Sequence, residues 1–202
     1  MPEDQQIFIE EAYKANPNTV VVLVAGSSLA INWIDQNIPA VLDAWYPGEQ
    51  GGTAVAEALF GDYNPGGKLP VTFPKTLGQI ELNFPFKPAS QSKQPEAGPN
   101  GYGKTRVNGA LYPFGFGLSY TTFEYSNLKV SPEKQGPKGD IQVSFDITNT
   151  GKRAGDEIVQ LYVKDKVSSV ISYESLLRGF KRVSLQPGET KNIQFTLHPE
   201  DL

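Results

Sequence analysis

The chain has 202 residues, a formal net charge of −4, 39% hydrophobic and 20% charged residues, and no cysteine. This composition is that of a globular rather than a disordered chain, and its acidic balance offers no basic surface to nucleic acid. Disulfides, thiolate metal ligands and cysteine nucleophiles are excluded, and no apolar run approaches the ~18 residues of a membrane span, so we expect neither nucleic acid nor a membrane as a partner.

The first third of the chain alternates between helical and extended patterns. Residues 2–16 have helical spacing until Asn16-Pro17-Asn18 ends the helix, and TVVVLVA at 19–25 is typical of a strand buried on both faces. A short helical segment at 29–37, a strand at 39–46, a helix at 51–60 and a strand at 68–73 follow. Gly61 is placed to end the 51–60 helix in the left-handed conformation. The alternation predicts a partial α/β fold, in which helices accompany a small parallel sheet.

The rest of the chain has two different patterns. Residues 74–110 are rich in Pro, Gly, Ser, Lys and Gln, which predicts a long irregular loop that is functional or wraps another surface. From residue 118 the apolar period becomes two, in five segments at 121–130, 141–150, 157–165, 177–185 and 191–199. They predict an all-β antiparallel sandwich of the immunoglobulin or fibronectin III type. The alternation is irregular at 157–165, which predicts a bulge or a doubly buried strand.

We therefore divide the chain into two domains. Residues 1–117 are predicted to form a partial α/β domain, with the irregular loop at about 74–110. Residues 118–202 are predicted to form a sandwich that is incomplete at its C-terminal end, because such sandwiches have about seven strands.

The stretch DAWYPGEQGG at 43–52 raises the question of a catalytic carboxylate. Glycoside hydrolysis uses two carboxylates, and the acids of the α/β part that we consider are Asp35, Asp43, Glu49, Glu57 and Asp62. Asp43 falls within a strand, Glu57 within a helix and Asp62 in a turn, where each has a structural explanation. Only Glu49 falls in a strand-to-helix loop, where open α/β sheets bind ligands. Its alternative role, which we favour, is to stabilise the start of the following helix through the helix dipole.

Other chemistries are less well supported. GEQGGT at 48–53 opens a helix after a strand, as anion sites do, but it lacks the Lys-Ser/Thr of a P-loop and the spacing of a dinucleotide fingerprint. GYGKT at 101–105 follows no strand. His198, the one histidine, has no G-x-S-x-G elbow to accompany it and is interpreted as a surface residue at a strand end. One histidine without cysteine argues against a catalytic zinc, so we predict no metal or cofactor.

Five specific blocks occur in order along the chain: NTVVVLVAGSSLAINW, VLDAWYPGEQGGTAVAEALFGDYNPGGKLPVTFP, LYPFGFGLSYTTFEYSNLKV, ITNTGKRAGDEIVQLYV and LRGFKRVSLQPGET. Together they resemble the C-terminal part of the family 3 glycoside hydrolases, which are mostly β-glucosidases and β-xylosidases. The resemblance covers nearly the whole chain except residues 77–108. It implies a parent protein with a TIM-like barrel that carries a nucleophilic Asp, an α/β sandwich domain that supplies an acid/base Glu, and a fibronectin III-like domain.

On this resemblance, the segments with both catalytic carboxylates are expected to precede Met1 and the last sandwich strands to follow Leu202. No residue of the chain is therefore assigned to catalysis, substrate binding, cofactor binding or metal binding. Glu49 matches a residue of the strand-to-helix loop and not the acid/base. YGKTRVNGALYPFG departs from the commoner Tyr-Arg-Tyr pattern of the family, so no substrate contact is assigned there.

The resemblance implies a parent enzyme that releases terminal non-reducing β-linked glucose or xylose from oligosaccharides by a retaining mechanism. The fragment alone is expected to be inactive, to meet its oligosaccharide substrate only together with the barrel, and to self-associate through exposed edges. An alternative is a non-catalytic carbohydrate-binding or scaffold module, which would use the aromatic-rich YPFGFGLSYTTFEY at 112–125. Relatives are commonly periplasmic or secreted, while the sequence itself assigns no location.

Overall fold

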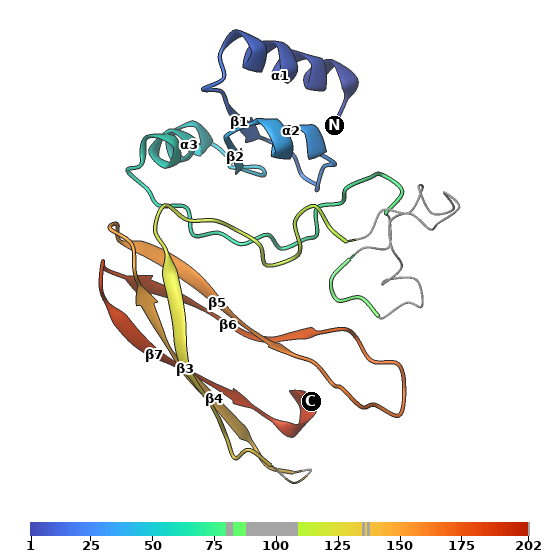
Figure 1. The fold of residues 1–202 in the computed structure, drawn as a ribbon, viewed down its shortest axis with the longest axis vertical. Coiled ribbons are helices and arrows are strands. Elements are labelled where there is room, and N and C mark those ends of the chain that lie inside the picture. Colours follow the sequence, from blue (N-terminus) through green and yellow to red (C-terminus); the bar gives the residue numbers. More distant parts are fainter. Residues whose placement is uncertain (80–82, 88–108, 135, 137, 202) are drawn as a thin grey trace, which may run out of the picture. The chain divides into compact units, whose positions relative to one another are not determined.

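The computed structural model of the chain describes residues 1–79, 83–87, 109–134, 136 and 138–201, and Figure 1 shows their elements. These residues form two compact units. The first comprises Met1–Asp62 and the described parts of Pro70–Phe84 and Ala89–Phe114; the second comprises Tyr63–Leu69 and the described parts of Pro85–Pro88 and Gly115–Leu202. The predicted domain boundary at 117/118 stays a prediction, because these units are defined by spatial proximity and not by independent folding.

The first unit is a small α/β structure. Its elements are α1 (Glu3–Ala15), β1 (Val20–Leu23), α2 (Asn32–Asn37), β2 (Ala40–Asp43) and α3 (Gly51–Phe60). Strands β1 and β2 pair in parallel, with Val20 opposite Ala40 and Leu23 opposite Asp43. Gly61 ends α3 with a φ of 85°, in the left-handed conformation that the sequence predicts. The partial parallel sheet with helices is therefore confirmed.

Two strand predictions in this unit are wrong in detail. Residues 68–73 form no strand of the parallel sheet; Phe73 instead makes an isolated antiparallel bridge with Tyr112. Pro70 explains the error, since a proline nitrogen cannot donate to a sheet ladder. The strand at 19–25 is not buried on both faces, because Val20 and Val24 are 45% and 61% exposed.

The irregular loop predicted at about 74–110 is only partly within the described residues. Its described residues, 74–79, 83–87 and 109–110, contain no helix or strand. The remainder, which includes GYGKT at 101–105, lies outside the described residues.

The second unit is an antiparallel sandwich with the five strands that the sequence predicts, followed by a short 3₁₀ turn (Pro199–Asp201). One sheet has the order β3-β4-β7 and the other pairs β5 with β6. The strand bounds are β3 Phe123–Ser131, β4 Ile141–Asn149, β5 Gly155–Val163, β6 Leu176–Leu185 and β7 Thr190–Leu197.

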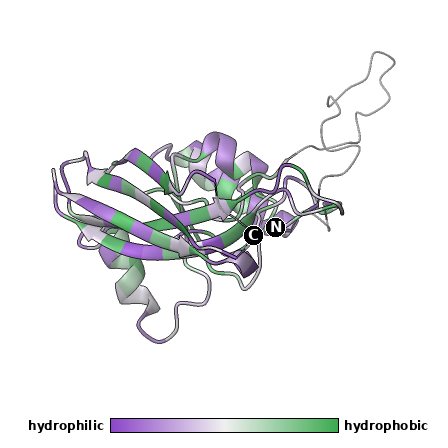
Figure 2. Ribbon diagram, turned by 90° about the horizontal axis from the view of Figure 1, so that it is seen from below, coloured by the Kyte–Doolittle hydropathy of each residue, from purple (hydrophilic) through white to green (hydrophobic). Residues whose placement is uncertain are grey.

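The sandwich core follows the period-two pattern of its strands. Apolar and polar residues alternate along these ribbons in Figure 2, and every second residue of β4 from Val143 to Asn149 is buried. The buried core is formed by Val143, Phe145, Ile147, Val159, Val183, Leu185, Ile193, Phe195 and Leu197. Strand β5 has the predicted irregularity, a register shift at Leu161 and Tyr162. It buries Glu157 and Val159, so a charged residue occupies an inward position.

Two segments outside the strands lie along β5. We call Tyr63–Leu69 the first strap and residues 115–121 the second strap. The first strap contacts β5 and the residue before it, because the Asn64 side-chain amide donates to the carbonyl of Ala154 at 3.0 Å and Gly66 packs against the carbonyl of Asp156. The second strap contacts it through the carbonyl of Gly115, which accepts a hydrogen bond from Gln160 at 3.2 Å. Since β5 pairs with a single strand, β6, among the described residues, the straps protect an otherwise open strand.

Candidate functional site

The carboxyl ends of β1 and β2 are the expected place for a ligand site in the first unit. The backbone continues from β2 into residues 44–50, where Trp45 has a φ of 50°, an unusual conformation for a large side chain. Its ring meets the buried ring of Phe73 edge-on at 6.2 Å. The neighbouring Tyr46 ring lies against Gly26, which follows β1, and is 77% exposed. The loop is thus fixed by aromatic packing and presents one exposed aromatic ring.

Asp43 is the partly buried acid of this edge. Its Oδ1 accepts the backbone N–H of Trp45 at 3.3 Å, while its Oδ2 is enclosed and has no hydrogen-bond partner among the described residues. Burial raises the pKa of Asp43, and the Trp45 N–H opposes this shift. The carboxylate therefore shapes the loop, but only one of its oxygens has a partner.

Glu49, the first catalytic candidate from the sequence, has an exposed side chain in this loop. The N-cap residue of α3 is Gln50, and its side chain makes no capping hydrogen bond. Glu49 therefore lies immediately before the helix start, in the position where a negative charge favours the helix dipole.

The remaining candidate acids, Asp35, Glu57 and Asp62, lie in separate elements. Asp35 lies in α2 and accepts a hydrogen bond from the hydroxyl of Tyr112, whose pKa is raised by burial and by this carboxylate. Glu57 is an exposed residue of α3, and Asp62 is exposed just after Gly61. Within the described residues, no interaction brings two of the five candidate acids together.

His198 lies just after β7, as the sequence predicts. Its Nδ1 is 3.0 Å from Oδ1 of Asp140, and this hydrogen bond raises the pKa of the imidazole. The pair is about half exposed on both sides, which is typical of a surface contact. In the part of the chain that the structure describes, no cluster of three or more His, Asp or Glu side chains is arranged to hold a metal ion, and no helix has the length and apolar character to cross a membrane.

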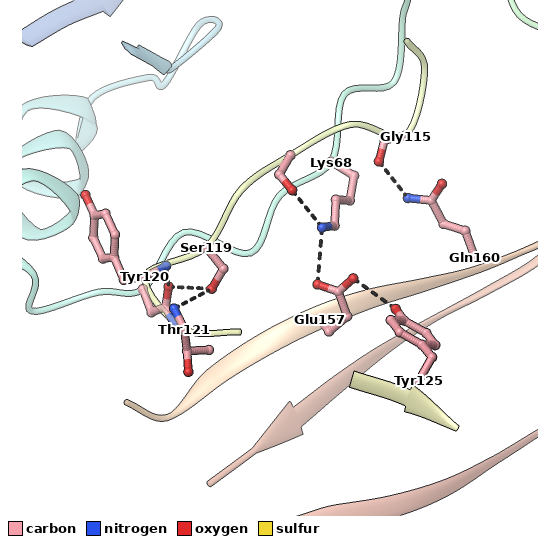
Figure 3. Close-up of polar contacts among 10 residues, drawn as sticks. Lys68, Gly115, Ser119, Tyr120, Thr121, Tyr125, Glu157 and Gln160 are labelled. Carbon is pink, nitrogen blue, oxygen red and sulfur yellow. Dashed lines mark hydrogen bonds and ion pairs between the residues drawn. The ribbon is translucent and has the colours of Figure 1, made fainter. Parts of the chain in front are cut away.

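The most enclosed ion pair of the described residues lies in the second unit, and the sequence did not reveal it. The Glu157 carboxylate is 3.2 Å from the ammonium of Lys68 and accepts the hydroxyl of Tyr125 at 2.9 Å (Figure 3). Lys68 also donates to the carbonyl of Gly117 at 2.9 Å. The side chains of Lys68 and Glu157 are only 16% and 11% exposed. Burial and the Glu157 charge raise the pKa of Tyr125, which keeps the phenol a hydrogen-bond donor.

The two units define a class of protein, a partial α/β domain followed by a fibronectin-type sandwich. The model of the glycosyl hydrolase family 3 C-terminal domain matches residues 1–120, and that of the fibronectin type III-like domain matches residues 157–202. The chain therefore belongs to glycosyl hydrolase family 3, as the sequence motifs indicate.

Curated relatives and solved structures agree with this membership. The chain is 44% identical over 98% of its length to a β-xylosidase of Formosa agariphila, and 39% identical over its full length to a periplasmic β-glucosidase of Salmonella typhimurium. It spans 27% of the length of each. A β-glucosidase structure from Listeria innocua matches 99% of the chain with a TM-score of 0.90 and 30% identity, and the chain covers 28% of that structure. A β-glucosidase structure from Erythrobacter marinus matches 98% with a TM-score of 0.85 and 41% identity, with 25% of it covered.

Proposed function

We propose that this chain is part of a β-glycosidase that removes terminal non-reducing β-linked glucose or xylose from oligosaccharides. The observation that carries the proposal is the identity of 39% to 44%, over nearly the whole chain, to a periplasmic β-glucosidase and a β-xylosidase. Because the chain spans about a quarter of these relatives, we assign the activity to a longer protein that also contains a barrel domain.

The mechanism that we propose for the longer protein uses two carboxyl groups. One carboxylate attacks the anomeric carbon while the other, as an acid, protonates the leaving glycosidic oxygen, which gives a covalent glycosyl-enzyme. The second group then acts as a base and takes a proton from water, which attacks the anomeric carbon and releases the sugar with retained configuration. This sequence of steps requires no metal or organic cofactor.

We assign neither carboxylate to this chain. No interaction among the described residues joins two of the five candidate acids: Asp43 has one enclosed oxygen, Asp35 accepts from Tyr112, and Glu49, Glu57 and Asp62 are exposed. A retaining pair needs two carboxyl groups about 5–5.5 Å apart on either side of the bond that is cleaved. Singly placed acids support the assignment of Glu49 to the helix start and the inactivity of the 202-residue chain alone.

A turnover assay of the purified chain with aryl β-glucoside and aryl β-xyloside tests this assignment. We expect no release of aryl alcohol above the uncatalysed rate, and the same result for Glu49→Gln and Asp43→Asn. Hydrolysis by the unaltered chain that is lost in Glu49→Gln would contradict the assignment. A fusion that restores the preceding domains should be active with both the unaltered and the Glu49→Gln sequence.

Partners follow from the same proposal. We expect the isolated chain to bind oligosaccharides weakly, because the sugar site is assigned to the longer protein. We also expect the isolated chain to self-associate through its exposed apolar side chains, such as Phe8 and Phe60. Titration with cellobiose, xylo-oligosaccharides and laminarin separates this proposal from the carbohydrate-binding module, since saturable binding by the chain alone favours the module. Size-exclusion chromatography measures the self-association, and a monodisperse monomer would contradict it.

A further inference from the structure

The two straps bind each other as well as β5. Asn64 joins them at one end, where its side-chain oxygen accepts the Ser119 hydroxyl and the backbone N–H of Tyr120, both at 2.9 Å. In the middle, Gly117 lies so close to the first strap that an added Cβ would be 2.2 Å from the carbonyl oxygen of Gly67. The straps therefore form one layer of chain.

Leu69 closes the other end of this layer. Its backbone N–H donates to the carbonyl of Phe116 at 2.7 Å, and its own carbonyl accepts the N–H of Gly115 at 2.8 Å. Leu69 and Gly115, the residues that flank positions 70–114, are thus held side by side by a pair of backbone hydrogen bonds. We call this pair the base of the 70–114 segment.

Lys68 and Glu157 lie directly beside this base. The Lys68 ammonium donates to the carbonyl of Gly117 in the second strap. Figure 3 shows the same ammonium paired with Glu157 on β5, which also accepts from Tyr125 on β3. A buried ion pair contributes little net stability against an apolar replacement, but loss of one partner leaves an uncompensated charge and is strongly destabilising. The role that we expect of the Lys68–Glu157 ion pair is therefore to specify one arrangement of the chain, in which the first strap lies on β5.

We propose that Lys68, Glu157 and Tyr125 form an interlock that fixes the base of the 70–114 segment on the sandwich. The sandwich then has a second task besides its own folding, because it holds the two ends of a long inserted segment side by side. The inference does not depend on the proposed function, since it concerns contacts within the second unit alone.

Hydrogen exchange of the 202-residue chain, resolved to single amides, tests the interlock. The reporters are the amides of Leu69 and Gly115, which make the two hydrogen bonds of the base. In Lys68→Met or Glu157→Gln we expect these amides to exchange at least about tenfold faster, because one charge or its partner is lost. The core amides of Val143 and Ile193 should remain within about twofold.

Two further variants make the result decisive. Tyr125→Phe keeps both charges and the ring, so it tests the interlock even where a charge variant fails to fold; we expect roughly threefold faster exchange at the base. Lys164→Met removes a more exposed ion pair with Glu174 in the same unit and should leave the base unchanged. Unchanged exchange at Leu69 and Gly115 in all interlock variants would overturn the proposal. An equal acceleration of the core amides would also overturn it, because the ion pair would then support the whole sandwich.

Discussion

Replacement of Asn149 by alanine should destabilise the sandwich more than any exposed polar change in the same strand. Asn149 is 0% exposed at the end of β4. Its side-chain oxygen accepts the Thr121 hydroxyl at 2.7 Å and the Gly151 N–H at 3.0 Å, and its nitrogen donates to the carbonyls of Arg153 at 2.7 Å and Leu185 at 3.1 Å. Both lone pairs of the amide oxygen and both hydrogens of the amide nitrogen are therefore used.

The expected magnitude follows from which partners water can reach. Thr121 and Leu185 are 7% and 1% exposed, so their polar groups stay unpaired in Asn149→Ala, at about 1–3 kcal/mol each. Arg153 is an exposed residue, so we expect water to replace the lost partner of its carbonyl. We therefore expect a loss of about 3 kcal/mol in the free energy of unfolding.

Urea unfolding followed by far-UV circular dichroism measures this loss. Both tryptophans, Trp33 and Trp45, lie in the first unit, so their fluorescence follows that unit separately. The matched control is Gln142→Ala on the same strand, which removes an exposed hydrogen bond with Thr196 and should change the free energy by about 0.5 kcal/mol or less. A loss below about 1 kcal/mol in Asn149→Ala, or one equal to that of the control, would refute the reasoning from buried unpaired groups.

Three further outcomes are expected. Asp43→Asn should be more stable than the unaltered chain at pH 7, because burial raises the pKa of Asp43 above its ordinary 3.8 and ionisation of this carboxyl therefore opposes folding. Thermal melts should show this gain in stability at pH 7 and its disappearance near pH 3. A variant that is less stable than the unaltered chain at pH 7 would contradict the expected sign. Gly117→Ala places a Cβ 2.2 Å from a backbone oxygen of the first strap and should lower stability by about 1–3 kcal/mol, whereas Gly52→Ala meets no atom within 4 Å and should not. His198 should titrate with a pKa above 6.5 in an NMR pH series, because Asp140 stabilises the imidazolium. The His198–Asp140 interaction then contributes fully to stability below pH 6.5, and this contribution is lost as the pH rises through the pKa of the folded state. Asp140→Asn should return the pKa of His198 towards 6.5.

The elements that the sequence predicts well are those whose pattern is local. Strands β4 and β7 alternate buried and exposed residues with period two because one face of each lies in the core. Helix α3 begins at a glycine pair and ends at Gly61, whose φ of 85° suits glycine. The family is also predicted from local blocks of sequence, because their order and spacing can be compared without knowing which residues are in contact.

The predictions that fail depend on partners far along the chain. Residues 68–73 have a strand-like composition, yet Leu69 pairs with the second strap and Phe73 pairs with Tyr112, both more than 35 positions downstream. The sequence pattern places Trp45 in the strand at 39–46, but Trp45 follows β2 with a φ of 50°, and its N–H donates to the Asp43 carboxylate. The hydrophobic pattern of the sequence cannot predict a backbone conformation, such as that of Trp45, that a tertiary contact determines.

Glu157 shows why the buried ion pair is not predicted from the sequence. In EIVQLYV the inward positions before the register shift are Glu157, Val159 and Leu161, and the charge at the first of them hides this alternation in the sequence. A carboxylate is tolerated there only because Lys68 reaches it from a segment that follows α3, and because Tyr125 occupies its other oxygen. The lysine of the PGGKLP block and the glutamate of the GDEIVQLYV block are thus two halves of one site. Two of the five blocks that carry the family resemblance are therefore brought together in the fold, through a buried carboxylate and the ammonium that pairs with it.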